Sequence, residues 1–246
     1  MLLVLLLAFT LQSSLAIALK RFDVLRVDPA GMERLPPSLR AIFTDPVPGA
    51  EPVDSLDQAV KRAGFDPRLP KSANTPQFGV MDPVRAQVTI GVADLNRALT
   101  DMKGADVAIP QNWDGVTIGI EQGRGILADY GDFFITQAPA LTLSVPAGFP
   151  FDQFVEVLSR AVGMNAAEAR TLSRRFAANP AVLFPISVRY DMDIREVRLN
   201  SGPGLLLQNA SKIGELALAW SSADRSYFVT GQLTEAEAID LANSIQ

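Results

Sequence analysis

Residues 115–145 read GVTIGIEQGRGILADYGDFFITQAPALTLSV, and this stretch holds four apolar runs separated by turn residues. In the first run Val116, Ile118 and Ile120 alternate with small or polar residues, which is the pattern of a half-buried strand. Gly123-Arg124-Gly125 is expected to make a hairpin turn after it. Strands so close in sequence predict antiparallel pairing, because parallel neighbours need a long crossover. The four strand candidates are 115–122, 126–130, 133–137 and 140–145.

Strand patterns continue on both sides of this stretch. Upstream, Gln87–Val92 alternates apolar and polar residues over its whole length. Adjacent strands with short turns are typical of an antiparallel α+β fold and not of the regular strand–helix alternation of a parallel sheet. The downstream strand candidates are 187–189, 194–199, 204–208, 216–221 and 226–231.

Helices are predicted where apolar residues recur at helical spacing behind a capping residue. A helical pair is expected at 152–162 and 165–178, joined at Gly163, with Asp152 capping the first helix and Asn165 the second. These elements predict an antiparallel sheet covered by a helical hairpin and a C-terminal helix. The remaining helices are expected at 55–63, 94–103 and 234–244.

The leader Met1–Leu19 carries no charged side chain and ends abruptly at Lys20-Arg21. Residues 1–19 are predicted to be a transmembrane anchor, although the apolar run is at the short end of the roughly 20 residues that a spanning helix needs. A signal peptide cleaved near Ala16-Ile17-Ala18 is the alternative, and a buried helix of a soluble fold is a third. Basic residues after the leader are on the unexpected side for an exported domain, so a cytoplasmic segment before Met1 is expected to set the orientation.

The chain is predicted to have three regions, namely the leader at residues 1–19, a connector and a folded domain, and the leader predicts where that domain lies. Residues 20–54 contain six prolines and are expected to be a Pro-rich, semi-rigid connector without a central strand. Residues 55–246 are expected to be an extracytoplasmic α+β domain at the cytoplasmic membrane. Cleavage of the leader would instead give a secreted or periplasmic protein.

Composition removes several classes of chemistry. The chain has no Cys and no His, so a Ser-His-Asp triad and a Cys- or His-ligated metal site are both excluded. A net charge of −5 argues against general nucleic-acid binding, which needs a basic footprint. We therefore expect a protein that is not an enzyme, holds no cofactor or metal and does not bind nucleic acid.

Four patterns suggest sites, each with a structural alternative. The helical pair has the outline of a DNA-binding helix-turn-helix, with Arg170, Arg174 and Arg175 on its second helix, but a hairpin covering a sheet fits better. Gly123-Arg124-Gly125 lacks the Lys-Ser/Thr of a phosphate loop. Asp191 and Asp193 alternate along a strand and could hold Ca²⁺, but a solvated strand face is the default. Asp129 or Asp132, beside Tyr130, could serve acid–base catalysis.

Three aromatic residues are candidates either for the core or for lining a lipid or peptide groove. Trp113 precedes the turn Asp114-Gly115, and Trp220 ends the strand that begins at Leu216. Tyr227 opens the following strand. Core packing is the default for such large side chains, while aromatic residues are also common in binding pockets.

The C-terminal block carries a family resemblance. Its motifs are Leu218-Ala219-Trp220, the segment Tyr227–Gly231 and the amphipathic helix at 236–245, and Ser55–Phe65 with Leu69-Pro70 resembles the opening of the same module. Over about residues 55–246 the chain is similar to an uncharacterised bacterial domain family, a domain of unknown function. Such domains often lie outside the cytoplasmic membrane, as C-terminal parts of membrane-anchored anti-sigma-factor-like proteins.

The resemblance implies a regulatory function with no catalytic residues. We expect a sensory or interaction domain that binds an unidentified protein or lipid and reaches the membrane through residues 1–19. The sigma-binding segment of such a regulator is expected upstream of Met1, since this chain has no Cys or His to bind zinc. The alternative is an exported carrier for a lipid or lipoprotein, which requires an apolar groove between sheet and helices.

Overall fold

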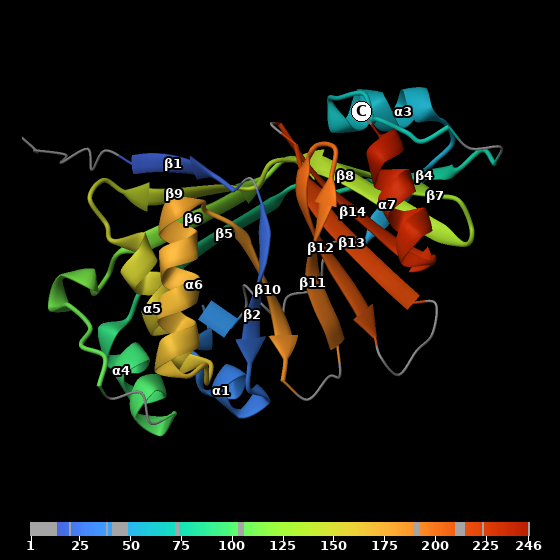
Figure 1. The fold of residues 1–246 in the computed structure, drawn as a ribbon. Coiled ribbons are helices and arrows are strands. Elements are labelled where there is room, and N and C mark those ends of the chain that lie inside the picture. Colours follow the sequence, from blue (N-terminus) through green and yellow to red (C-terminus); the bar gives the residue numbers. More distant parts are fainter. Residues whose placement is uncertain are drawn as a thin grey trace, which may run out of the picture.

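The computed structural model has two lobes joined by long strands (Figure 1). Both lobes combine mostly antiparallel sheet with helices, so the predicted α+β class is confirmed. The structure describes residues 14–19, 21–37, 39–40, 49–71, 74–102, 106–188, 192–209, 215–222 and 224–245.

The helical lobe is a four-stranded antiparallel sheet, ordered β1-β9-β6-β5, with three helices packed on it. Buried residues of the sheet and helices form one core, which includes Ile118, Leu143 and Leu95. The predicted helical hairpin is confirmed as α5 and α6, although Pro150 and not Asp152 is the N-cap of α5. The elements are β1 (Ser14–Ala18), β9 (Thr142–Pro146), β6 (Thr117–Gln122), β5 (Val84–Thr89), α4 (Val92–Asp101), α5 (Phe151–Ala161) and α6 (Ala166–Ala178).

The sheet lobe is an eight-stranded antiparallel sheet, ordered β11-β12-β13-β14-β8-β7-β4-β3. Helix α7 (Glu235–Ser244) covers one face, where Ala238 and Ala242 pack with Leu218 and Trp220. Helix α3 (Leu56–Ala63) packs through Ala59 on the β4–β7 end. The strands are β11 (Met192–Leu199), β12 (Gly202–Asn209), β13 (Glu215–Ser221), β14 (Arg225–Gln232), β8 (Phe133–Pro139), β7 (Gly125–Asp129), β4 (Gln77–Met81) and β3 (Ala50–Val53).

Three strands pass from one lobe into the other. In each of the pairs β4–β5, β7–β6 and β8–β9 one strand lies in the eight-stranded sheet and its sequence neighbour in the four-stranded sheet. The register is kept across the junction: Met81 faces Gly125, and Val84, three residues further on, faces Gln122, three residues further back. The lobes therefore share one bent, three-stranded antiparallel ribbon.

The hairpin predicted at Gly123-Arg124-Gly125 is wrong, because β6 and β7 belong to different sheets and do not pair with each other. The two glycines instead allow a close approach at the bend of the ribbon. A Cβ on Gly123 would lie 2.9 Å from Pro139 Cγ, and one on Gly125 would lie 3.2 Å from the Gln137 carbonyl oxygen. Small residues were needed here for packing between strands and not for a reversal of the chain.

A two-stranded parallel sheet fills the space between the lobes. Strand β2 (Phe22–Val27) pairs in register with β10 (Val182–Ser187), and α1 (Pro29–Arg34) follows β2. Leu25 is fully buried, and Leu35 and Leu39 are buried as well. The spacer predicted for 20–54 is thus replaced, where it is described, by core elements: Pro29 starts a helix at its first turn instead of preventing one.

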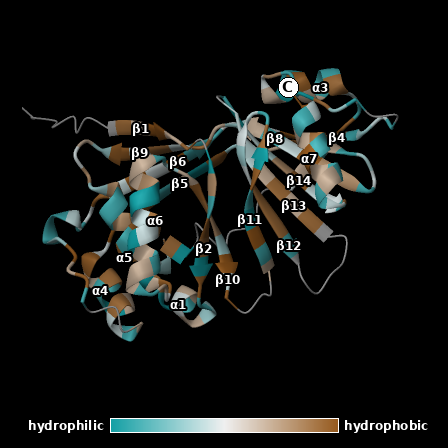
Figure 2. Cartoon of the chain, in the orientation of Figure 1, coloured by the Kyte–Doolittle hydropathy of each residue, from teal (hydrophilic) through white to brown (hydrophobic). Residues whose placement is uncertain are grey.

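The leader is described only at its C-terminal end, since residues 1–13 lie outside the described part. Ser14–Ala18 form β1, an edge strand that pairs antiparallel with β9. The end of the run predicted as a spanning helix is therefore strand, with Leu15 54% exposed. None of the described helices has the length and apolar character needed to cross a membrane. Figure 2 shows the apolar character of β1 and β9 beside the polar outer side of α6.

Candidate functional site

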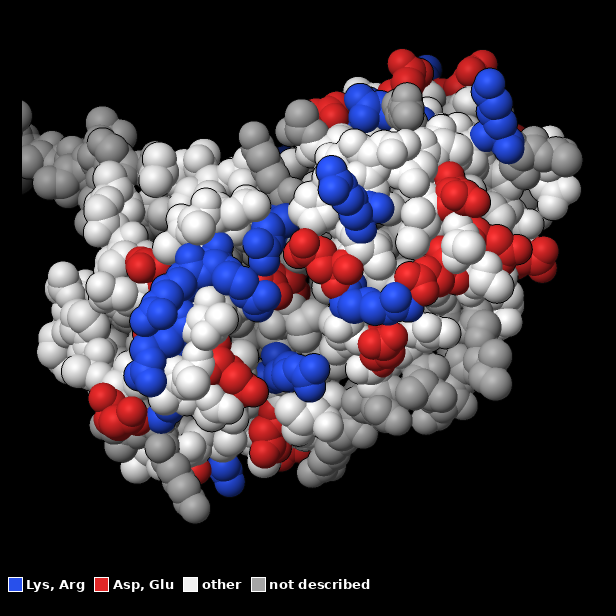
Figure 3. Space-filling model, viewed as in Figure 1, with Lys and Arg blue, Asp and Glu red and all other residues white. Residues whose placement is uncertain are grey.

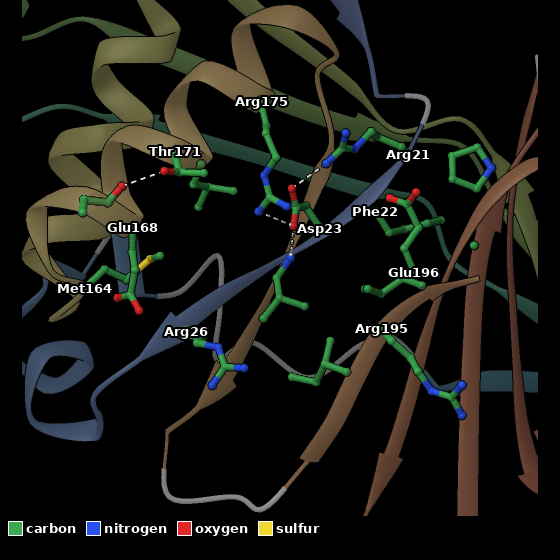
Figure 4. Close-up of a pocket in the computed structure, with 17 residues that line it drawn as sticks. Arg21, Phe22, Asp23, Arg26, Met164, Glu168, Thr171, Arg175, Arg195 and Glu196 are labelled. Atoms are coloured by element: carbon green, nitrogen blue, oxygen red, sulfur yellow. Dashed lines mark hydrogen bonds and ion pairs between the residues drawn. The ribbon is translucent and has the colours of Figure 1, made fainter. Parts of the chain in front are cut away.

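A cleft of about 480 Å³ lies between the two lobes. Helix α6 forms one side, β11 and β12 form the other, and β2 forms the floor (Figure 4). We call it the interlobe cleft. Its lining consists of Arg21, Phe22, Asp23, Val24, Arg26, Met164, Ala167, Glu168, Thr171, Leu172, Arg175, Ile194, Arg195, Glu196, Pro203, Gly204 and Leu205.

A buried carboxylate organises the floor of this cleft. Asp23 is only 8% exposed, and its two oxygens accept hydrogen bonds from Arg21 Nη2 at 2.6 Å and Arg175 Nη2 at 3.0 Å. The backbone N–H of Val24 also donates to Asp23 Oδ1, at 2.9 Å. A buried carboxylate needs such partners, because removing an unpaired charge from water is costly. Asp23 therefore ties β2 to α6 and fixes the position of both guanidinium groups (Figure 4).

Local structure explains why these side chains meet. Glu168, Thr171 and Arg175 recur at intervals of three and four residues along α6, so they share one helix face. The capping box of Asn165 and Glu168 sets the start of that helix. On β11, Arg195 is held outside the floor by Glu235, with contacts of 2.9 and 2.5 Å, and by Asp193.

Three further arginines at or near the interlobe cleft have no ion pair or hydrogen bond among the described residues. Arg26 lies on β2, and Arg170 and Arg174 lie on the exposed side of α6. Figure 3 shows a stripe of basic side chains that runs along α6 toward the cleft. On a chain with a net charge of −5, such a stripe concentrates positive potential on one face.

The base of the cleft also has an apolar component. Phe22 and Val24 on β2, Leu172 on α6 and Ile194 and Leu205 of the sheet lobe line it. Arginines around an apolar base suit an anionic ligand that has some apolar surface, because the guanidinium group binds carboxylates in a fixed fork geometry. The arrangement can bind and orient such a ligand.

The three aromatic candidates are all buried. Trp113 packs in the helical-lobe core against Phe149, with ring centroids 5.3 Å apart. Trp220 and Tyr227 stack on each other in the sheet-lobe core, with centroids 5.0 Å apart and rings nearly parallel at 6°. These last two also line a second, smaller cleft. None of the three lies in the interlobe cleft.

Of the carboxylates considered for catalysis or metal binding, Asp129 and Asp193 have local partners, and Asp132 is an exposed residue between β7 and β8. Asp129 accepts a hydrogen bond from Gly131 N–H at 2.8 Å, in the β7–β8 hairpin. Tyr130 stacks on Phe133, and burial raises the pKa of its hydroxyl, which disfavours the ionised form. Asp193 pairs with Arg195, while Asp191 lies outside the described residues. Within the described part no group of three or more acidic residues is placed to hold a metal ion.

Most residues of the interlobe cleft were not identified from the sequence. Arg21, Asp23 and Arg26 lie in the stretch expected to be a connector. No apolar–polar alternation in the sequence marks them, because the buried positions of Phe22–Val27 include Asp23 while the apolar Phe22 and Val24 are only half-buried. Arg175 was noted only as part of a helix-turn-helix outline.

No protein-family model, curated protein or solved structure matches this chain. The family suggested by the C-terminal block and the Ser55–Phe65 segment therefore stays a prediction.

Proposed function

We propose that this chain is a non-enzymatic binding domain that takes an acidic ligand, such as an acidic polypeptide segment, in the interlobe cleft. The observation that carries this proposal is the arrangement of arginines around the cleft. Arg21 and Arg175 are fixed by Asp23, and the half-exposed Arg175 makes a single hydrogen bond to it through Nη2. Arg26, Arg170 and Arg174 supply positive charge without a partner among the described residues.

The geometry favours an acidic ligand over the lipid that a carrier would hold. A lipid carrier requires an apolar cavity between sheet and helices. In the helical lobe that interface is filled by buried side chains such as Leu95, Val155 and Leu158. The interlobe cleft opens instead beside charged side chains, and an ionic rim favours a charged group.

We further propose that the domain belongs to a membrane-anchored, anti-sigma-factor-like regulator and lies on the extracytoplasmic side. The uncharged N-terminal run and the resemblance over about residues 55–246 support this part of the proposal, with Ser14–Ala18 of that run in β1 and only the residues before it left to reach the membrane. In such a regulator the domain senses its signal by binding a ligand that contacts both lobes, and the ribbon that the lobes share transmits it. Binding alone is sufficient for that task, and no catalytic group is required.

Fluorescence anisotropy of labelled hexaglutamate tests the binding proposal on the full chain. Hexaglutamate is expected to bind, hexaglutamine is not, and affinity is expected to fall as salt rises from about 50 to about 300 mM, since salt screens exposed charges. The double variant Arg26→Gln/Arg174→Gln is expected to weaken binding at least about tenfold. The matched control Lys61→Gln/Arg85→Gln removes the same charge from exposed positions elsewhere. Equal binding by both peptides, or by both double variants, overturns the proposal.

N-terminal sequencing of membrane and soluble fractions tests the location. The anchor predicts a membrane-bound chain that keeps its leader. A soluble chain that begins after Ala18 contradicts the anchor and supports a cleaved signal, and this cleavage would remove the whole of β1.

A further inference from the structure

A second cleft of about 340 Å³ lies within the sheet lobe, where α7 ends against β13 and β14. We call it the Arg68 cleft. It shares no lining residue with the interlobe cleft. Its lining consists of Arg68, Asn200, Ser201, Trp220, Ser222, Tyr227, Ala242, Asn243 and Ile245.

The backbone of Arg68 is held by a glutamine that the sheet buries almost completely. Gln137, 1% exposed on β8, accepts from the Arg68 N–H at 2.9 Å and donates through Nε2 to the Arg68 carbonyl at 2.5 Å. The same loop is fixed a second time by Arg225, which donates to the Asp66 carbonyl and lies over the Phe65 ring. A buried amide that spends both polar ends on one residue positions that residue closely.

The side chain of Arg68 is only partly used. Its Nη1 donates to the Tyr227 hydroxyl at 3.0 Å and to Ser222 Oγ at 3.4 Å. Its Nη2 is 3.7 Å from Asp224 Oδ1, which is an ion pair beyond hydrogen-bond distance. Among the described residues, neither Nη2 nor Nε of Arg68 has a hydrogen-bond acceptor. These two groups form the edge of the guanidinium that receives a carboxylate through two parallel hydrogen bonds.

The other lining groups fit the same ligand. The Tyr227 hydroxyl accepts from Arg68, so its own O–H is left to donate, and no described residue accepts from it. Asp224 is occupied: Ser222 donates to it at 3.1 Å. Burial raises the pKa of Asp224, but that hydrogen bond and the charges of Arg68 and Arg225 outweigh burial and hold the pKa below its usual value. Ala242 and Ile245 provide an apolar wall.

We propose that the Arg68 cleft binds a small carboxylate, whose two oxygens accept from Nε and Nη2 of Arg68 and whose carbon skeleton lies against Ala242 and Ile245, while Tyr227 holds the guanidinium through Nη1. Among the described residues that line the cleft, Arg68 is the only charged one, and Asp224 pairs with it from outside the lining, so the cleft favours a ligand with no more than one negative charge. Its volume is near the lower limit of ligand pockets, about 300 Å³, which favours a ligand of about ten heavy atoms or fewer.

The chain contains two tryptophans, and they provide an internal control. Trp220 lines the Arg68 cleft, whereas Trp113 lies in the core of the other lobe. In ¹H–¹⁵N spectra of the full chain, each indole N–H gives one signal. A titration with acetate, butyrate and benzoate, and with the matching amides, therefore reads the cleft and a distant site together.

We expect at least one carboxylate to shift the Trp220 signal in a saturable way, with no shift of Trp113 and no response to the matching amide. Arg68→Gln is expected to weaken that binding at least about tenfold, and Tyr227→Phe by a smaller factor. Arg85→Gln, which removes an exposed arginine from the other lobe, is the control. If Arg68→Gln fails to fold, Arg68→Lys replaces it in this test, because lysine keeps the charge but cannot donate two parallel hydrogen bonds to a carboxylate.

Two results would overturn the proposal. One is a set of titrations in which no carboxylate shifts Trp220, or in which each amide acts as well as its acid. The other is unchanged binding in a folded Arg68 variant. Neither result depends on the interlobe cleft, so the binding of hexaglutamate stands or falls separately.

Discussion

The two clefts are built in opposite ways. The interlobe cleft is composite: β2, α6 and β11–β12 contribute to it from both lobes, and a buried ion network around Asp23 organises it. The Arg68 cleft lies within one lobe, and a neutral buried amide, Gln137, positions its arginine. Binding in the interlobe cleft depends on how the two lobes are arranged, whereas binding in the Arg68 cleft depends on one lobe alone; salt screens the arginine charges in both. The first is suited to sensing and the second to simple capture.

The largest effect is expected at the floor of the interlobe cleft. Leu25→Ala leaves a cavity beneath β2, and the free energy of unfolding should fall by about 3 kcal/mol in urea denaturation. Leu15→Ala, at an exposed position of β1, is the control and should change it by less than about 0.5 kcal/mol. A small loss for Leu25→Ala would show that β2 is a loosely attached spacer.

The next effect concerns the ion network. Asp23→Asn keeps the shape of the side chain and leaves Arg21 and Arg175 facing a neutral group. Because Arg175 is half exposed, we expect a loss near 2 kcal/mol in urea denaturation, below the ~3–5 kcal/mol for breaking a fully buried pair. Asp94→Asn breaks an exposed pair with Arg97 and should cost under about 0.5 kcal/mol. Equal losses would remove the distinction between the two carboxylates.

Carboxylate binding in the Arg68 cleft should depend on Gln137, the neutral residue that positions Arg68. Gln137→Met keeps the size of the side chain and leaves the Arg68 N–H and carbonyl without these partners, so stability should fall by about 1.5 kcal/mol. Carboxylate binding should weaken with it, while hexaglutamate binding in the interlobe cleft stays unchanged. Gln87→Met, at an exposed position of β5, serves as the control for the substitution itself. Loss of binding at both clefts would mean that they are not independent.

The smallest effect is a dependence on pH at the start of α7. Hydrogen bonds from Thr234 lower the pKa of Glu237, so the ionised carboxyl stabilises the folded state. This contribution is present above the unfolded pKa, near 4.3, and is lost as pH falls through the lower folded value. Glu237→Gln should flatten part of the decline in thermal midpoint from pH 5 to pH 3. An unchanged decline would contradict a stabilising role for this cap.

The sequence predicted elements whose signals are local. Capping boxes placed the starts of α6 and α7, and alternation placed the strands between 115 and 145. The predicted cap of α5, Asp152, is wrong because the helix already begins at Phe151, so Pro150 is the N-cap and Asp152 lies in the first turn. Local patterns predicted a single antiparallel sheet covered by the helical hairpin and the C-terminal helix, whereas the hairpin packs on the four-stranded sheet, α7 packs on the eight-stranded sheet, and β2 and β10 form a separate parallel pair.

The elements that sequence reasoning missed depend on partners far along the chain. Strand β2 pairs in parallel with β10, which is about 160 residues away, and no local pattern encodes that partner. Pro185 lies within β10, where proline is tolerated because this strand is at the edge of a two-stranded sheet. The interlobe cleft rests on this pair, so its arginines could not be brought together from the sequence alone.

Mapping of backbone amide shifts on addition of hexaglutamate tests the central proposal most directly. The account predicts the largest shifts in three separate segments, residues 21–26, 164–175 and 194–205, which belong to both lobes and to β2. Residues of the Arg68 cleft should remain unchanged. Shifts confined to one lobe, or centred on Arg68, would contradict a composite ligand site between the lobes.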